Sequence, residues 1–446
     1  PKGERRVEHY ITEIRIDTLR HLSDITISLN EKKRQHLMIT GKNGSGKTSL
    51  LLAIQKYLRA INNGELKALT LVYIPWLKKV EEKIEHAEAE SEKQKIEKES
   101  ELNMNLIRKY QDGVRIRFNV DSNSTLDELY KEGDFITAFF PAHRKTQIVR
   151  AQGVEDIRLN NSYTMEEEPG NLLLKYMVHL KTQQAYAKNE GDMETAEKIQ
   201  KWFERFEGAL RTLLDDDSLF LEYDYKEYDF KIHEDGREPF GFDMLSDGYS
   251  SVIYMVSDLI LRMDRNWLLK GDLREYDIEG IVLIDELETH LHIELQKKIL
   301  PFLTEFFPRI QFIVTTHSPY ILNSISNAKA YDLERCIELE NLSLYSSDGL
   351  AEGYFEADAY GDELKKKIER YAYLMRKEDL TEEERAQRAE LRSELKNIPQ
   401  NLAYEAREKF EDIEESINDK NRKKADRQGA ESDRSFVKSA GNGCWL

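Results

Sequence analysis

Three glycines, a lysine and a threonine within eight residues, GKNGSGKT, have the spacing of a phosphate-binding loop. Gly41, Gly44 and Gly46 lack a Cβ, so the backbone can curl until successive N–H groups point inward at an anion. Lys47 adds a positive charge for the β- and γ-phosphates, and Thr48 adds a hydroxyl that can ligate Mg²⁺. We therefore expect this segment to bind a nucleotide. The expected contact residues are Gly41, Asn43, Gly44, Ser45, Gly46, Lys47, Thr48 and Ser49.

Two adjacent acids supply the second part of a hydrolytic site. Asp285 and Glu286 follow the apolar run IVLI, and in phosphate-loop enzymes an aspartate at such a strand end holds Mg²⁺ together with the loop threonine. Glu286 can act as general base on the attacking water. His317 follows a second β-branched run, IQFIVTT, where an imidazole can reach the γ-phosphate. The expected catalytic residues are Lys47, Glu286 and His317, and the expected metal ligands are Thr48 and Asp285.

A serine and a glycine about 200 residues after the phosphate loop form a second anion-binding turn. The segment MLSDGYSS places Ser246 and Gly248 directly before a long apolar helix, and the N-terminus of a helix favours negative charge. One triphosphate does not easily use both turns of one molecule. The arrangement makes sense if two copies pack head to tail and each closes the nucleotide site of the other.

These residues need strands and helices to position them. Alternation in residues 8–40 predicts a β-meander whose last strand, QHLMIT, leads into the phosphate loop, and TSLLLAIQKYLRAI then predicts a helix. The short runs 280–286 and 310–317 are typical of buried parallel strands. Further strands are expected at LTLVYIPW, GVRIRFNVD, DFITAFFPAHR, SLFLEYDY and DFKIHED.

Helical segments interrupt this framework. Residues 77–108 are dense in Glu and Lys and contain no Gly or Pro, which predicts a solvated helical insertion or, alternatively, an arm that docks a partner or guides nucleic acid. Residues 163–214 have apolar residues at helical spacing. The aromatic residues expected to pack this second helical region are Trp202, Phe203 and Phe206.

The pattern changes again after residue 335. Helical spacing continues, and a capping box from Thr381 to Glu384 opens one helix. Another helix is expected at 402–417, followed by a polar tail with a basic cluster, KNRKKADR. Neither an H-N-H cluster nor a clear set of metal-binding acids is evident in this part of the sequence.

Composition limits the possible functions. The chain has 446 residues, 34% of them charged, and a net charge of −18, which argues against nucleic-acid binding over the whole surface but leaves room for a local basic groove. Cys336 and Cys444 lie far apart without CxxC spacing, so neither a zinc site nor a disulfide framework is expected, and a reducing cytoplasm fits best. No apolar stretch has the length of a membrane helix, and no secretory signal is evident.

The four motifs together resemble the ATP-binding-cassette (ABC) ATPases of the RecF/SMC/Rad50-like branch. The segment from ITEIRID to the phosphate loop resembles that branch's opening, LIDELETHLH resembles its Walker B strand and D-loop, and TTHSP its switch histidine. LSDGYSS is similar to the signature loop, although Asp247 replaces the usual Gly and Tyr249 the usual Gln. The resemblance implies Mg-ATP at a dimer interface, and Gln147 or Arg144 as the Q-loop residue.

This resemblance implies an α/β fold, an ABC-ATPase head with a mixed sheet and flanking helices, together with helical insertions and a helical C-terminal region. The expected segments are the N-terminal part of the head with the phosphate loop (1–76), the charged insertion (77–112), a strand-rich return (113–162), a helical subdomain (163–214), the C-terminal part of the head (215–335), and a partner-binding helical region with the polar tail (336–446).

A narrower resemblance concerns the segments between the motifs. DFITAFFPAHR, residues 181–211 and residues 343–374 look like the ATPase subunit of Septu-type anti-phage systems and their retron-associated relatives. That resemblance implies an HNH-type nuclease as partner and, in some systems, a reverse transcriptase with its RNA–DNA product. We expect a slow regulatory ATPase that controls such a nuclease. The alternatives are a RecF/SMC-like repair ATPase that binds duplex DNA and, less favoured, the nucleotide-binding subunit of a membrane transporter.

Overall fold

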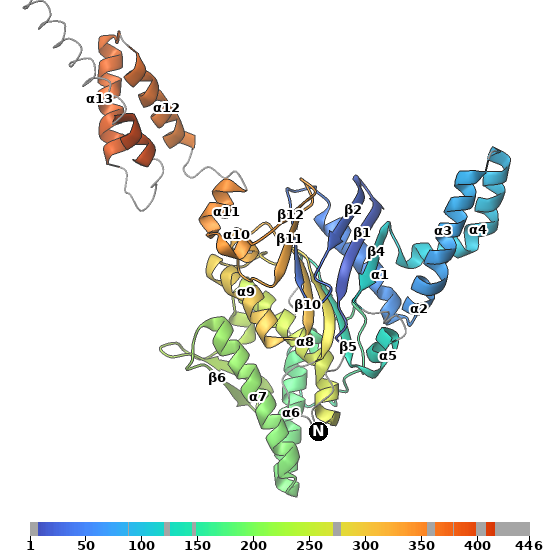
Figure 1. Cartoon of the computed structure of the whole chain (residues 1–446). Helices are drawn as coiled ribbons and strands as arrows, with labels where there is room; N and C mark the ends of the chain where they lie inside the picture. Colours follow the sequence, from blue (N-terminus) through green and yellow to red (C-terminus); the bar gives the residue numbers. More distant parts are fainter. Residues whose placement is uncertain are drawn as a thin grey trace, which may run out of the picture. The chain divides into compact units, whose positions relative to one another are not determined.

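The computed structural model describes residues 8–87, 89–119, 125–144, 149–270, 278–354, 362–377, 379–397 and 407–414. The chain divides into two units, Pro1–Ser347 and Asp348–Leu446. The described strands all belong to the first unit (Figure 1). They form one six-stranded sheet and two three-stranded sheets.

A three-stranded antiparallel sheet opens the fold. Its order is β2-β1-β4, with buried and exposed residues alternating along β1 and β2. The expected meander is therefore wrong in its third strand, because β3 lies in another sheet. Every residue of β3 is buried, as suits a strand covered on both faces. The bounds are β1 Ile11–Leu19, β2 Leu22–Ser28, β3 His36–Thr40 and β4 Val114–Phe118.

A six-stranded mixed sheet holds the ends of the functional motifs. Its order is β12-β11-β3-β10-β9-β5, with β12 antiparallel and the other five strands parallel. The two buried parallel strands expected from the sequence are β9 and β10, and they are neighbours. The remaining bounds are β5 Phe135–Phe140, β9 Glu279–Ile284, β10 Ile310–Thr315, β11 Ala328–Asp332 and β12 Ile337–Leu339.

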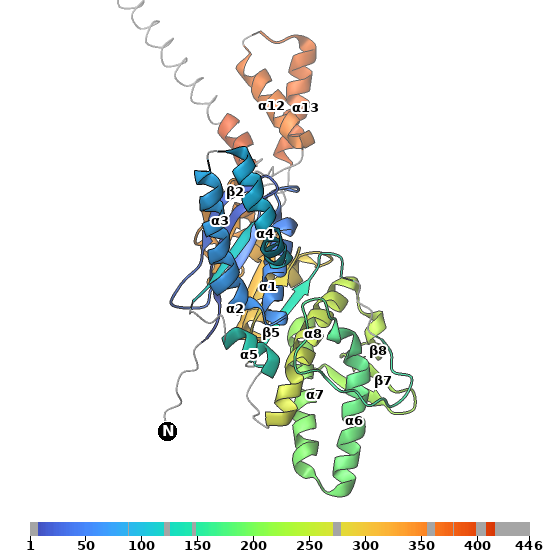
Figure 2. The ribbon, with the colours of Figure 1, turned by 90° about the vertical axis from the view of Figure 1, so that its right-hand side faces the viewer.

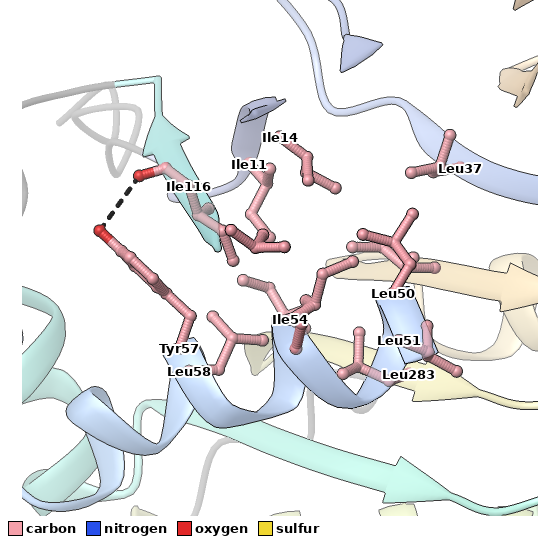
Figure 3. Close-up of a cluster of buried hydrophobic side chains, with 14 of the residues drawn as sticks. Ile11, Ile14, Leu37, Leu50, Leu51, Ile54, Tyr57, Leu58, Ile116 and Leu283 are labelled. Atoms are coloured by element: carbon pink, nitrogen blue, oxygen red, sulfur yellow. Dashed lines mark hydrogen bonds between the residues drawn. The ribbon is translucent and has the colours of Figure 1, made fainter. Parts of the chain in front are cut away.

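The first helix after the phosphate loop is the centre of the core. Helix α1, Lys47–Asn62, lies between the β2-β1-β4 sheet and the six-stranded sheet (Figure 1). Its side chains Leu50 and Ile54 belong to one buried cluster with Ile14 of β1 and Leu283 of β9 (Figure 3). Burying such a side chain contributes about 1.5–3 kcal/mol, so this cluster fixes the loop that precedes α1 against both sheets.

Strand β5 shows how both faces of the six-stranded sheet are covered. The Asn62 side chain of α1 donates to Thr137 Oγ1 at 2.8 Å. The Phe140 ring packs edge-to-face on Tyr254 of α8, with centroids 6.2 Å apart. Because side chains alternate along a strand, residues 137 and 140 face opposite sides. Helix α1 thus covers one face of the sheet and α8, Asp247–Lys270, the other.

The segment LTLVYIPW is helical, which corrects the expected strand. It forms a π-turn, Leu69–Tyr73, between α2 and α3. Thr70 Oγ1 donates to the Leu66 carbonyl at 2.8 Å, a contact made across one helical turn. A short apolar run does not by itself distinguish a strand from a helix. The helices here are α2 Leu66–Ala68, α3 Ile74–His86, α4 Glu90–Tyr110 and α5 Thr125–Glu132.

A second pair of helices, α6 and α7, lies side by side (Figure 2). Helix α7 carries the expected aromatic packing. The rings of Trp202 and Phe206 stack with centroids 5.5 Å apart, and Phe203 stacks on Phe230 at 5.8 Å. Phe230 belongs to the small antiparallel sheet, whose order is β6-β7-β8. The bounds are α6 Leu173–Glu190, α7 Met193–Leu214, β6 Phe220–Asp224, β7 Asp229–His233, β8 Phe240–Gly241, α9 Ile293–Phe306 and α10 Pro319–Leu322.

The second unit is helical in the residues described. The capping box is confirmed, with Thr381 and Glu384 exchanging both hydrogen bonds at the start of α13. Of the helix expected at 402–417, residues 407–414 are helical; the rest of it, and the basic tail cluster, lie outside the described residues. The bounds are α11 Ser347–Gly353, α12 Asp362–Arg376 and α13 Glu382–Lys396. The buried cluster consists of Ile368, Tyr371, Leu374, Leu391, Leu395 and Phe410.

Candidate nucleotide site

The functional motifs meet at one edge of the six-stranded sheet. Four parallel strands in the order β3-β10-β9-β5 end there, and the segments that follow them are the phosphate loop, the TTHSP segment, the Asp285–Glu286 pair and the loop with Arg144. Ligands of open α/β sheets bind at the carboxyl ends of the strands. The described structure therefore brings together motifs that lie up to about 270 residues apart.

The phosphate loop has the backbone that its glycines predict. Gly41, Gly44 and Gly46 have φ of 128°, 88° and 98°, values that other residues rarely adopt. Gly41 is also closely packed, because a Cβ there would lie 2.9 Å from Ser45 Oγ. The Ser45 amide donates to the Lys42 carbonyl at 3.1 Å. The loop is a curled turn leading directly into α1.

Lys47 closes this loop from inside. Its ammonium donates to the carbonyls of Gly41 at 2.7 Å and Lys42 at 3.1 Å. Burial lowers the pKa of Lys47, while nearby carboxylates, Glu286 first among them, act in the opposite direction. An ammonium paired only with backbone carbonyls keeps its full charge available to an anion, so the geometry fits the expected phosphate contact.

Thr48 and Asp285 come together as the expected metal-ligand pair requires. Thr48 Oγ1 lies 3.3 Å from Asp285 Oδ1, and Thr315 Oγ1 donates to the same carboxylate oxygen at 2.6 Å. Mg²⁺ is usually held by one or two carboxylates together with phosphate oxygens. This hydroxyl and this carboxylate would be the ligands that the protein contributes to such a Mg²⁺ site.

Glu286 has an unusual backbone conformation. Its φ is 46°, in the left-handed region that costs a non-glycine residue about 1–2 kcal/mol. Its amide donates to Thr315 Oγ1 at 2.7 Å, and its carboxylate accepts from Thr289 Oγ1 at 3.2 Å. Strained backbone of this kind concentrates at functional sites, and here it occurs at the acidic residue directly after Asp285.

His317 is held by an acid that the motif analysis does not single out, Glu288. The His317 amide donates to Glu288 Oε1 at 2.6 Å. Among the described residues, neither His317 Nε2 nor Glu288 Oε2 has a hydrogen-bond partner, although both are buried. Burial, followed by the charge of Lys47, lowers the pKa of His317, so the imidazole is neutral at pH 7. The second Glu in IDELE is the only sequence signal for this partner.

The signature residues lie away from the phosphate loop of their own chain. Ser246 is exposed and precedes α8, and Gly248 is buried in its first turn. No hydrogen bond among the described residues joins either of them to the loop. A Cβ on Gly248 would lie 2.6 Å from the His290 carbonyl oxygen, so this glycine is also needed for α8 to approach the segment after Glu286.

Arg144, one of the two expected Q-loop residues, points into the protein. It donates to the carbonyls of Asp285 and Glu286 and to Ser251 of α8. The other, Gln147, lies outside the described residues. Long-range contacts of this kind have no local sequence signature.

Strand β11 adds a contact that the sequence also does not reveal. The buried carboxylate of Asp332 accepts from the amide of Glu334 at 2.7 Å, and Glu334 forms an ion pair with Lys42 at 3.0 Å. The turn after β11 thus supports the phosphate loop from the side opposite β10.

The fold and this edge define a phosphate-loop ATPase domain of the ABC type. Residues 37–323 match the family described as "AAA domain, putative AbiEii toxin, Type IV TA system". The match spans well over half of the chain, and the chain belongs to this family.

Similar proteins agree with the narrower resemblance. "Septu protein PtuA" of Bacillus mycoides (strain KBAB4) is 41% identical over 97 residues, which are 22% of this chain and 12% of the relative. "Retron Vc95 probable ATPase" of Vibrio cholerae serotype O1 biovar El Tor is 32% identical over 224 residues, 49% of this chain and 40% of the relative. The chain thus matches less than half the length of these relatives. The solved "SmcHead bound to the C-winged helix domain of ScpA" aligns with a TM-score of 0.39 and 13% identity, over 75% of this chain and all of the other.

No helix in the described part of the chain is both long and apolar enough to span a membrane.

Proposed function

We propose that the chain binds Mg-ATP at the carboxyl edge of the six-stranded sheet and hydrolyses it slowly. The observation that carries the proposal is a group of buried polar atoms that have no hydrogen-bond partner among the described residues: Ser45 Oγ, Glu288 Oε2 and His317 Nε2. Leaving such a group unpaired costs about 1–3 kcal/mol. Unpaired atoms gathered beside a phosphate loop are best explained by a ligand that supplies the missing partners.

The charges of the edge favour a triphosphate that arrives with a divalent cation. Lys47 lies near four carboxylates, those of Glu286, Glu288, Asp285 and Asp332, which would repel phosphate oxygens on their own. Bound Mg²⁺ would neutralise part of the phosphate charge. Thr48 and Asp285 would hold the ion, and Lys47 with the loop amides would orient the phosphates.

Two side chains would act on the water and on the terminal phosphate. Glu286 is the general base, because it directly follows Asp285 and its carboxylate is oriented by the hydrogen bond from Thr289 Oγ1. The neutral imidazole of His317 offers Nε2 as a hydrogen-bond partner to the γ-phosphate or to the water. Glu288 accepts a hydrogen bond from the His317 amide and thereby keeps the imidazole ring within reach of the phosphate.

The exposure of two signature residues supports dimerisation around ATP. Ser246 and Asp247, the first residue of α8, are exposed, which suits a contact with the nucleotide of a second copy. Each ATP would then be contacted by both protomers, so that ligand binding favours association. Hydrolysis would loosen the pair.

We further propose that this cycle regulates an effector nuclease of HNH type in anti-phage defence in the cytoplasm, with a reverse transcriptase and its RNA–DNA product as a further partner in some systems. The partial matches to Septu and retron ATPases support this assignment. The competing function is a repair ATPase of the RecF/SMC sort on duplex DNA, and the net charge of −18 disfavours it.

Light scattering of the purified chain with and without Mg-ATP, alone and beside its co-expressed genomic neighbour, tests both the dimerisation around ATP and the association with a nuclease. We expect ATP to double the mass of the Glu286→Gln protein and not that of Lys47→Ala. A stable complex with a nuclease supports the regulatory role. Dimerisation without such a complex, together with an ATP-dependent shift onto duplex DNA, would instead establish the repair function.

A further inference from the structure

Arg144 connects three segments through one guanidinium group. Its Nη1 donates to the Asp285 carbonyl at 3.2 Å, its Nη2 to the Glu286 carbonyl at 3.1 Å, and its Nε to Ser251 Oγ at 3.0 Å. We propose that Arg144 is a positioning residue for hydrolysis: it fixes the orientation of the Glu286 carboxylate and ties the end of β9 to the beginning of α8.

The strained backbone of Glu286 explains why such a residue is needed. A φ of 46° is disfavoured for glutamate and persists only when the surroundings hold it. Thr315 Oγ1 holds the amide side of this residue, and Arg144 holds its carbonyl side. Without Arg144 the carbonyl is released, the backbone relaxes towards an ordinary conformation, and the side chain turns away from the water that it should activate.

A second contact fixes the same segment to α8. Gly248 packs so closely on the His290 carbonyl that a Cβ would lie 2.6 Å away. His290 also has a left-handed backbone, with φ of 65°. The segment 286–291 is therefore held against the first turns of α8 at both of its ends, by Arg144 with Ser251 and by Gly248. Movement at the signature surface is transmitted to the general base through these contacts.

The chemistry of arginine suits this role. A planar guanidinium can donate to two successive carbonyls and a hydroxyl at once, whereas a lysine ammonium is a point charge without this fork. Burial lowers the pKa of Arg144 to about 10, which leaves the group charged at neutral pH. All three of its described hydrogen bonds end on protein atoms, so its loss should affect turnover rather than nucleotide affinity.

The test compares Arg144→Ala and Arg144→Lys with the control Arg158→Ala, which removes an exposed arginine paired with Asp156. The kinetic part rests on the proposed function. We expect Arg144→Ala to lower kcat about 10- to 100-fold, to change the Kd for ATP less than about 3-fold, and to recover part of its activity in millimolar guanidinium. Arg144→Lys should resemble Arg144→Ala, and the control should resemble the wild type.

Hydrogen exchange of the nucleotide-free protein tests the same inference without any activity. Arg144→Ala should speed amide exchange in 286–291 and in 247–252, and Arg158→Ala should not. Wild-type turnover in Arg144→Ala, or a loss of ATP affinity as large as the loss of kcat, overturns the inference, and so does unchanged exchange in both segments. If the wild type itself does not hydrolyse ATP, the proposed function fails and the exchange experiment still decides the role of Arg144.

Discussion

The acids at the two ends of β9 differ in whether their carboxylate oxygens have hydrogen-bond partners. At its N-terminal end, Glu279 accepts from His9 Nδ1 at 3.0 Å and from the His9 amide at 2.9 Å, and pairs with Arg309 at 3.4 Å. Both of its oxygens are satisfied. At the C-terminal end the buried Glu288 Oε2 and His317 Nε2 have no partner among the described residues.

This difference distinguishes structural from functional polar groups. A buried polar group normally has a hydrogen-bond partner, and the cluster at the N-terminal end obeys that rule. The other end departs from it at several atoms of one small region, which costs stability unless a ligand binds. At β9 the satisfied acid holds the sheet together, and the atoms without a partner lie at the edge where we propose that the nucleotide binds; Asp127 Oδ1 and Asp264 Oδ1 also have no partner among the described residues.

The largest expected effect separates catalysis from stability at the C-terminal end. Glu286→Gln should lower ATP turnover about 10²- to 10⁴-fold, the contribution typical of a general base, while the free energy of unfolding stays within about 0.5 kcal/mol. Steady-state hydrolysis and urea unfolding measure the two quantities. The matched control is Glu294→Gln, an exposed acid on α9. Turnover at the wild-type rate in Glu286→Gln would remove this residue from the role of base.

The opposite result is expected at the other end of the strand. Glu279→Leu should lower the free energy of unfolding by about 3–5 kcal/mol, because it removes the buried acceptor of His9 and one of the acids that pair with Arg309. Isothermal titration should give an unchanged Kd for ATP for the folded fraction. Glu279→Gln retains part of the hydrogen bonding and should cost less. If ATP affinity falls in Glu279→Gln, the two ends are not independent.

Lys47→Ala should weaken ATP binding about 10²- to 10³-fold, the loss typical of one buried donor to a charged oxygen. The melting temperature of the nucleotide-free protein should hardly change, because the hydrogen bonds of Lys47 within the described structure go to two loop carbonyls. Lys298→Ala is the control, since that ammonium belongs to α9, outside the phosphate loop, and pairs with Asp215. Equal ATP affinity in the two variants would contradict the proposed phosphate contact.

A buried histidine at the N-terminal edge should make stability sensitive to acid. His36 Nδ1 accepts the Phe312 amide at 3.1 Å, and burial followed by the charge of Arg34 lowers the pKa of His36 to about 4. The unfolded chain therefore binds a proton below pH 6.5 that the folded chain does not bind until pH 4. Stability falls by about 2 kcal/mol between pH 7 and pH 5 from this group alone.

Urea unfolding of the wild type and His36→Gln at both pH values isolates that contribution. Burial raises the pKa of Asp127 to about 6 and that of Asp264 to about 7, and these two groups act in the opposite direction as pH falls. Asp127 and Asp264 are present in the wild type and in His36→Gln, so their contributions cancel when the pH dependence of one protein is subtracted from that of the other. An equal pH dependence in wild type and variant would show that His36 is not the source.

The sequence predicts what local spacing determines. The glycines of the phosphate loop, the acids after β9 and the histidine after β10 each follow from a few consecutive residues. Arg144, Glu288 and the β11 turn do not, because their roles depend on which strand ends are neighbours. Two further errors concern QHLMIT, which is a strand as predicted but lies in another sheet, and LTLVYIPW, which is helical. QHLMIT pairs with β10 and β11, which are far from it in the sequence. LTLVYIPW is a short apolar run, a pattern that fits a helix as well as a strand.

The neighbours of β3 also determine when the site can first exist. This strand ends at Thr40 and pairs with β10 and β11, which reach residues 315 and 332. A ribosome that adds 5–20 residues per second needs about 15–60 s to make the intervening chain. Throughout that time the phosphate loop has emerged without the strands that support it. A nascent chain of this protein therefore gains its nucleotide site only after residue 332 has been made, when helices α1 to α10 have already been synthesised.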